Sequence, residues 1–279
     1  MRINKVWAVY FSGTDTTKNT VKYIADKVAE TLGAAQDEFN FTPKPARTGW
    51  PEFGPEDLLV FGTPVIAGRV PNVLLKYLAT LPGNGALGVP VVLYGNRNYD
   101  DALIELRDIL QDGGCRTIAA GAFIGEHSFS KTLAAGRPDE ADFAVMEEFA
   151  KKVAEKARGL SEDDPSLAEP VFVKGTPKPY RGYYQPRDRQ GTHIDIRKVK
   201  PKTDTDICLE CGVCIEVCPM DSVDHMDVTN VPGICIKCCA CVKKCPVGAK
   251  YYDDKGYLYH QHELEEMYTD TRREPELFF

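Results

Sequence analysis

Two copies of one cysteine pattern near the C-terminus constrain this chain more than any other feature of its sequence. The first copy is Cys208-x2-Cys211-x2-Cys214-x3-Cys218-Pro219, and the second is Cys235-x2-Cys238-x2-Cys241-x3-Cys245-Pro246. Each position of the second copy lies 27 residues after its counterpart (208 to 235, 218 to 245), so the segment is an internal repeat. A disulfide scaffold is typically a short secreted chain with cysteines spread along it. Nine of the ten cysteines fall between Cys208 and Cys245, a density that indicates metal ligands.

The repeat resembles the cysteine runs of bacterial-type ferredoxins that hold two [4Fe–4S] clusters. In those runs three closely spaced thiolates bind one cluster and the fourth binds the other. The resemblance implies one cluster on Cys208, Cys211, Cys214 and Cys245, and a second on Cys235, Cys238, Cys241 and Cys218. Structural zinc is the alternative, but zinc sites usually pair two C-x2-C knuckles. Cys239 breaks the spacing and Cys115 stands alone, so we expect both to pack as small buried side chains.

The first part of the chain alternates short apolar runs with helical patterns. Strands are expected at residues 6–11, 58–61, 89–94 and 117–123, with a weaker one at 38–41. Helices are expected at 17–32, 72–79, 101–110 and 139–157. This alternation predicts right-handed βαβ units and a parallel sheet. The predicted domains are 1–160, a Pro-rich ordered connector at 161–202, the cysteine domain at 203–256 and a tail at 257–279, which has a helical pattern at 262–268.

Three loops follow predicted strands at the sheet edge where doubly wound folds bind ligands. The loop from Ser12 to Thr17 is rich in hydroxyls and leads into a helix, and such a helix N-terminus can bind an anion. No lysine follows in the P-loop pattern, which argues against a nucleoside triphosphate. A hydroxyl-rich helix cap is the alternative interpretation. The other two loops span residues 62–71 and 94–101.

These loops are similar to the flavin-binding loops of flavodoxins, with Ser12, Thr14 and Thr17 matching the phosphate-loop pattern. The resemblance implies a five-stranded parallel sheet of order 2-1-3-4-5 that binds FMN. A flavin-free domain is the alternative, because Asp15 stands where flavodoxins usually have Gly and would repel a phosphate unless it faces solvent or a cation such as Lys18. The flavin contacts that the resemblance implies are Ser12, Thr14, Thr16, Thr17, Thr63, Pro64, Ala67, Gly68, Gly95, Asn96, Arg97, Tyr99 and Asp100.

The whole chain resembles flavodoxin–ferredoxin fusion proteins, often called ferrodoxins, which are found mainly in anaerobes. The resemblance implies an α/β flavodoxin-like domain joined to a small α+β ferredoxin domain. It also implies electron transfer between FMN and two clusters, coupling two-electron and one-electron redox partner proteins. A flavin-dependent reductase is the alternative function, with Tyr99 and His127 as the candidate acid or base, and a non-redox zinc module is a third. No catalytic residue is assigned, and whether the chain is an enzyme is left open.

Charge and hydropathy restrict the partners further. The net charge of −7 argues against nucleic acid, because phosphate binding needs a basic face. No run approaches the ~18 apolar residues of a membrane span, and the N-terminus lacks a signal-peptide pattern. We therefore expect a cytoplasmic protein with protein redox partners, and the long connector is compatible with a homodimer.

Overall fold

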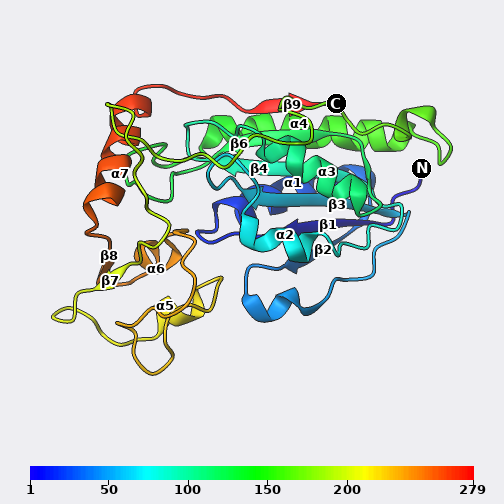
Figure 1. Ribbon diagram of the computed structural model, residues 1–279. Coiled ribbons are helices and arrows are strands. Elements are labelled where there is room, and N and C mark those ends of the chain that lie inside the picture. The colour runs from blue at the N-terminus through cyan, green and yellow to red at the C-terminus, as the bar shows by residue number, and fades with distance from the viewer.

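A mostly parallel β-sheet forms the centre of the molecule (Figure 1). We describe all residues from Met1 to Phe279 in a computed structural model. The sheet order is β2-β1-β3-β4-β6-β9, with the short β5 also paired to β4. The first five positions reproduce the predicted order 2-1-3-4-5, so the doubly wound α/β fold is confirmed. The strands are β1 (Lys5–Tyr10), β2 (Ala35–Asn40), β3 (Asp57–Pro64), β4 (Leu87–Tyr94), β5 (Arg116–Thr117), β6 (Ala120–Ile124) and β9 (Glu276–Phe278).

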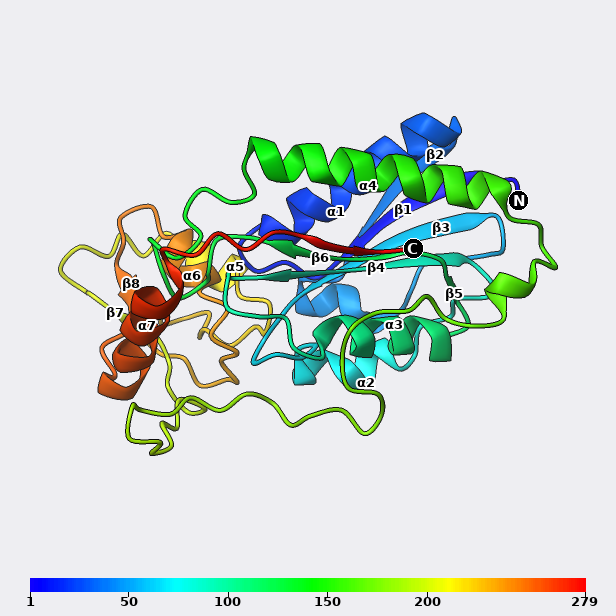
Figure 2. The same ribbon diagram turned by 90° about the horizontal axis from the view of Figure 1, so that it is seen from above.

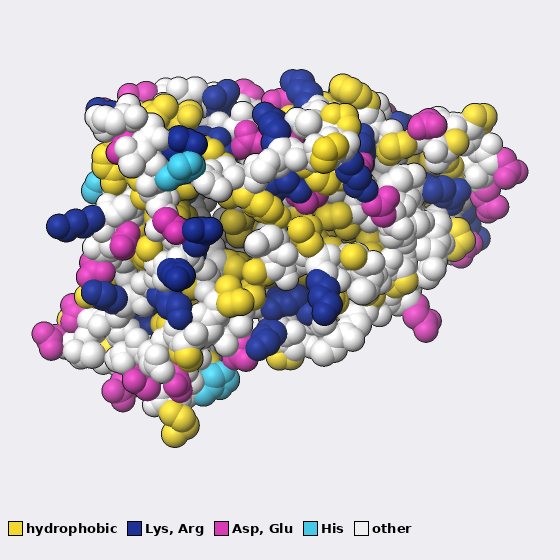
Figure 3. Space-filling view, in the orientation of Figure 1, with side chains coloured by type: hydrophobic (Ala, Val, Ile, Leu, Met, Phe, Trp, Pro, Cys, Tyr) yellow, Lys and Arg dark blue, Asp and Glu magenta, His cyan; other side chains and the backbone are white.

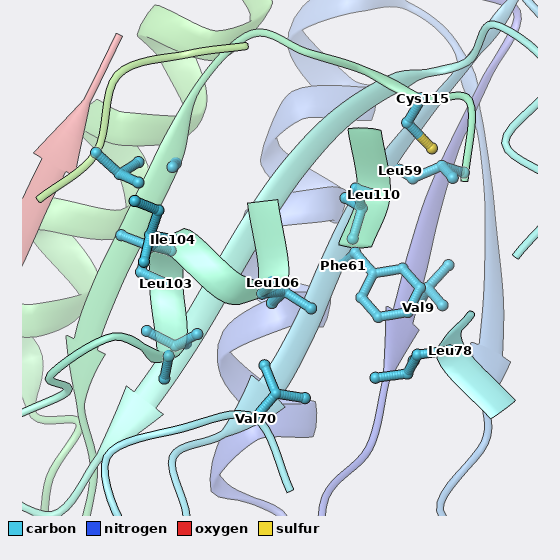
Figure 4. Packing of buried hydrophobic residues seen from close by; sticks show 14 of the residues in the cluster. Val9, Leu59, Phe61, Val70, Leu78, Leu103, Ile104, Leu106, Leu110 and Cys115 are labelled. Carbon is cyan, nitrogen blue, oxygen red and sulfur yellow. The ribbon is translucent and has the colours of Figure 1, made fainter. Parts of the chain in front are cut away.

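Helices cover both faces of the sheet, as Figure 2 shows. The helices α1 (Thr16–Leu32) and α4 (Glu140–Gly159) lie on one face, and α2 (Leu75–Leu78) and α3 (Ala102–Asp112) lie on the other. Alternation along β1 sends Ala8 and Tyr10 into the core beneath α1 and α4, and Val9 into the opposite core, part of which Figure 4 shows. The sheet, and with it the carboxyl ends of its strands, is therefore held between two hydrophobic layers.

Several elements differ from the sequence prediction. The segment predicted as a helix over 72–79 is a 3-10 turn, η2 (Asn72–Leu74), followed by the short α2. The predicted fifth strand is divided into β5 and β6, and the turns η1 (Lys44–Thr48) and η3 (Pro165–Leu167) were not predicted. The tail helix is longer than its pattern indicated, because α7 spans Lys255–Tyr268. After it the chain returns to add β9 antiparallel to β6.

The cysteine-bearing part is small and has little regular structure. It contains a two-stranded antiparallel sheet of β7 (Lys202–Thr203) and β8 (Lys250–Tyr251), and the one-turn helices α5 (Val213–Glu216) and α6 (Ala240–Lys243). It lies beyond the carboxyl ends of the parallel strands, at the lower left of Figure 1. Because β9 joins the tail to the first sheet, we keep the four predicted domain boundaries as an interpretation only. No helix combines the length and apolar character that crossing a bilayer requires.

Candidate functional site

Each of the two predicted cysteine sets surrounds its own void in the cysteine-bearing part. We call these sets the first ring and the second ring. The first ring is Cys208, Cys211, Cys214 and Cys245, which line a small void that is partly open to solvent. The second ring lines a similar void, and Cys239 lines it together with the ring cysteines Cys218, Cys235, Cys238 and Cys241. The fold thus brings Cys218 and Cys245 each to the void of the other run, and all ten cysteines are free thiols.

The rings are not arranged as single-ion sites. No group of three or more His, Cys, Asp or Glu side chains is placed to hold one metal ion. Zinc–thiolate bonds are about 2.3 Å long, so four thiolates on one zinc ion lie within about 4 Å of one another. Each void offers four cysteines of the two runs, a donor set that suits an iron–sulfur cluster.

The backbone around the two rings repeats with the same 27-residue offset as the sequence. Residues 213–216 form α5 and residues 240–243 form α6. The Ser222 N–H donates to Cys218 Sγ at 3.3 Å, and the Ala249 N–H donates to Cys245 Sγ at 3.2 Å. An N–H donor stabilises thiolate over thiol. Each crossing cysteine is therefore prepared to act as a ligand by an equivalent local turn.

The same repeat explains the extra Cys239. It occupies the position of Gly212, and both residues precede their helix in the left-handed conformation, at φ 59° and 75°. The Cys239 side chain is buried, and its sulfur lies 3.4 Å from the Tyr257 hydroxyl. Burial raises the pKa of the Cys239 thiol to about 12, and equally those of Cys238 and Cys241, so the repeat position and the buried packing are what favour a packing role for Cys239. That role remains a prediction.

The second ring lies against the loop that follows β1. A Cβ atom at Gly13 would lie 3.1 Å from Cys238 Cβ and 3.4 Å from Cys238 Sγ. Next to it, Asp15 precedes α1 in the left-handed conformation, at φ 65°, and pairs with Lys244 at 2.8 Å. The sequence suggested solvent or Lys18 for this carboxylate. The actual partner is a lysine that lies 229 positions further along the chain, beyond the reach of any local pattern.

Other contacts join the two parts beside the ring cysteines. Lys243, which lies between Cys241 of the second ring and Cys245 of the first ring, pairs with Glu126 and donates to the His127 carbonyl at 2.9 Å. Arg47 donates to the carbonyl of Pro219, the residue after Cys218, at 2.5 Å. On the face shown in Figure 3, Lys and Arg side chains gather along the boundary between the two parts, and Asp and Glu gather at the outer end of the cysteine-bearing part.

The predicted phosphate-binding residues lie together at this edge. Ser12 is 6% exposed and its hydroxyl has no hydrogen-bond partner, and the fully buried Thr63 hydroxyl is also unpartnered. Thr17 is buried, while Thr14 and Thr16 are half-buried. An unpartnered buried hydroxyl costs free energy, so these two side chains are available to a bound group.

The predicted flavin-ring residues have other partners. Asn96 donates to the carbonyls of Tyr268 and Thr271, at 2.7 and 2.6 Å, and thereby holds the tail. Tyr99 is 5% exposed and packs in the core against Tyr94, with ring centroids 5.6 Å apart. The predicted flavin stack on Tyr99 therefore does not fit this arrangement, because no face of the ring is open.

The connector covers the same two loops. Arg97 pairs with Asp100 and lies 4.4 Å from the centre of the Tyr184 ring. The Tyr184 N–H donates to the Ala67 carbonyl at 2.8 Å. Gly95 and Gly68 have no room for a side chain. A Cβ atom on Gly95 would lie 2.3 Å from His127, and one on Gly68 would lie 2.3 Å from Asp100. Pro64 ends β3 beside Leu93. The connector and His127 therefore pack on both loops, and the flavin-ring contacts of these residues stay predictions.

Buried ion pairs fix the connector in this position. Asp101 is fully buried and accepts from the Arg181 side chain at 2.6 Å. Arg69 pairs with the buried Glu105 at 2.6 Å and lies between the rings of Tyr180 and Tyr183. Sequence reasoning missed these pairs because each joins residues that are many positions apart. The frequent Arg and Tyr residues of the connector were the only feature of the sequence that pointed to these contacts.

No family model and no curated protein matches the chain. Among solved structures it is similar to a flavodoxin from the domain Archaea, at 15% identity over 55% of this chain and 99% of that one, with a TM-score of 0.39. It is also similar to a flavodoxin of Streptococcus pneumonia TIGR4, at 21% identity over 55% and 99%, with a TM-score of 0.38. A third is the apo form of an NADH:FMN oxidoreductase, at 16% identity over 59% and 93%, with a TM-score of 0.38. At these scores the fold assignment rests on the strand order alone.

Proposed function

We propose that the chain is an electron-transfer protein that holds one [4Fe–4S] cluster in each ring. The observation that carries the proposal is that each void is lined by three cysteines of one run and the crossing cysteine of the other. Such clusters exchange single electrons, at potentials set by charge, hydrogen bonds to sulfur and solvent exposure. The chain supplies the thiolates, the N–H donors to Cys218 and Cys245, and the walls of the two voids.

The two rings have different surroundings, which supports different roles. In the first ring Cys211 is exposed, and the neighbouring Leu209 side chain is 65% exposed. The second ring is covered by the loop at Gly13. A redox partner protein can therefore approach the first ring at the exposed Cys211, whereas the second ring has the first domain packed on one side and the 68% exposed Ile234 on another. We expect electrons to enter or leave through the first ring.

Cofactor analysis of anaerobically purified protein tests the proposal. We expect about eight irons and eight sulfides per chain, and an EPR signal on reduction. Cys211→Ser should reduce the iron content by about half, and Cys115→Ser is the matched control, because Cys115 is buried in the first domain far from both rings along the chain. Colourless protein that contains zinc would overturn the proposal.

FMN at the same sheet edge is a second candidate, favoured by the unpartnered buried hydroxyls of Ser12 and Thr63. Arg97 stacks on Tyr184 and Asn96 binds the tail, so these two predicted flavin contacts have protein partners, and we derive no step that passes through a flavin. Release of one FMN per chain on denaturation would support this candidate, and Ser12→Ala should then lower the FMN content. Protein that neither contains FMN nor binds it in a fluorescence titration would exclude it.

The reductase alternative lacks a supporting observation. Burial lowers the pKa of His127 to about 3, so the imidazole is neutral, and it packs against Gly95 and Phe129. Burial raises the pKa of Tyr99, which lies inside the core. Neither group lies where it could exchange a proton with a substrate. A cytoplasmic location, redox partner proteins and a homodimer stay predictions.

A further inference from the structure

We propose that the Ser12–Thr17 loop is part of the binding site of the second cluster and raises the reduction potential of that cluster. The inference rests on the proposed function, because it requires a cluster in the second ring. It gives the loop a role that does not depend on a nucleotide phosphate. It also assigns the first domain a direct part in the redox chemistry, through a loop that packs on the ring cysteine Cys238.

The contact at Gly13 is the first reason. The backbone of this loop packs directly on Cys238, because a Cβ atom at Gly13 would be only 3.1 Å from Cys238 Cβ and 3.9 Å from Ala240 Cβ. Real Cβ atoms rarely approach their neighbours as closely as 3.1 Å, so a side chain at this position would push the ring and the loop apart. The φ angle of Gly13 is not positive, so backbone conformation does not require a glycine there. Close approach to the second ring is the remaining physical reason for a residue without a side chain.

The electrostatics of the loop are the second reason. The loop leads into α1, a 17-residue helix with no acidic residue in its first turn. The first N–H groups of a helix have no partner within it and carry a partial positive charge. Ser12 adds a hydroxyl that is buried and has no partner. A cluster becomes more negative when it takes up an electron, so N–H and O–H donors beside it favour the reduced state and raise its potential.

The ion pairs across the boundary are the third reason. Asp15 flanks the loop, and its pairing with Lys244 holds α6 and the loop together. Lys243 and Arg47 make the neighbouring contacts, to Glu126 and to Pro219. Lys243 and Lys244 lie between Cys241 of the second ring and Cys245 of the first ring, and Pro219 follows Cys218 of the second ring. None of these contacts flanks residues 208–214, so the first domain is fastened to the segment that carries Cys235, Cys238 and Cys241.

Two variants of the full-length, cluster-loaded chain test the inference by redox titration followed by EPR. Ser12→Ala removes an unpartnered hydroxyl, so the fold should be retained, and one of the two midpoint potentials should shift to a lower value. Gly13→Ala should push the loop away from Cys238. It should lower the same midpoint potential, and a chelator should remove iron faster from the second cluster. Cys211→Ser, which perturbs the first ring, identifies the other signal.

The matched controls remove equivalent groups elsewhere. Thr20→Val also removes a fully buried, unpartnered hydroxyl, but one helical turn further from the loop. Gly182→Ala adds a Cβ atom where nothing lies within 4 Å. Both should leave both midpoints unchanged. Iron-loaded Ser12→Ala and Gly13→Ala proteins with unchanged midpoints, or with a shift only in the first-ring signal, would overturn the inference. Wild-type protein without iron would instead overturn the proposed function.

Discussion

Asp101 is the residue whose replacement tests most directly how the connector is held. Its carboxylate is fully buried at the start of α3. It accepts hydrogen bonds from the Arg181 side chain at 2.6 Å and from the N–H groups of Arg181 and Thr176, both at 2.9 Å. These bonds fasten the connector beside the loops that follow β3 and β4. Loss of the carboxylate should therefore release this part of the connector.

The size of the effect follows from the pKa of Asp101. Burial by itself would raise this pKa, but the hydrogen bonds from Arg181 and Thr176 outweigh burial and lower it from 3.8 to about 2. A difference of this size corresponds to about 2 kcal/mol of stabilisation in the folded state. Because the folded-state pKa is the lower one, this stabilisation is fully present above about pH 4 and is lost as the pH falls towards 2.

Asp101→Asn should lower the free energy of unfolding by about 2 kcal/mol, equally at pH 7 and pH 5, since both lie above the pH range of the loss. Urea unfolding measures the deficit, and hydrogen exchange should become faster at residues 176–184. Asp112→Asn is the control, because it removes an exposed bond from α3 to Lys178, worth under about 1 kcal/mol. A deficit below 0.5 kcal/mol, on the order of a surface pair, or one that shrinks between pH 7 and pH 5, would refute the reasoning.

Three further predictions concern the rings and the buried histidines. Cys238→Ser should lower the iron content from about eight to about four per chain, whereas Cys239→Gly should keep it near eight, because the repeat places glycine at the equivalent position. Stability should fall by about 2 kcal/mol per pH unit as the pH drops from 6.5 to 4.5, since burial lowers the pKa of His127 to about 3 and that of His260 to about 4. These histidines stay neutral in the folded state and take up protons only on unfolding. His260→Gln should make the thermal unfolding midpoint depend less on pH, and an unchanged dependence on pH would contradict this. In air, the first-ring EPR signal should disappear before the other, because Cys211 is exposed; loss in the reverse order would contradict the assigned exposure.

The sheet was predictable because its signals are local. Apolar runs of four to six residues mark β1, β3 and β4, and Val21, Ile24, Ala25 and Val28 mark the buried face of α1. The short helix after η2 and the break between β5 and β6 were not predictable, since backbone geometry at such points depends on packing. Strand β9 was missed because a three-residue strand at a chain end gains its definition only from its partner β6.

The sequence by itself predicted the two cysteine rings, because the repeated spacing resembles the ligand runs of two-cluster ferredoxins, which implies the crossing of Cys218 and Cys245. Only the tertiary structure decided what the rings contact. The partner of Asp15, the packing of Gly13 on Cys238 and the closure of the loops by Asn96 all join residues more than 100 positions apart. Such contacts depend on how two separately stabilised parts dock, and that docking uses charges and backbone groups which carry no periodic signal along the chain.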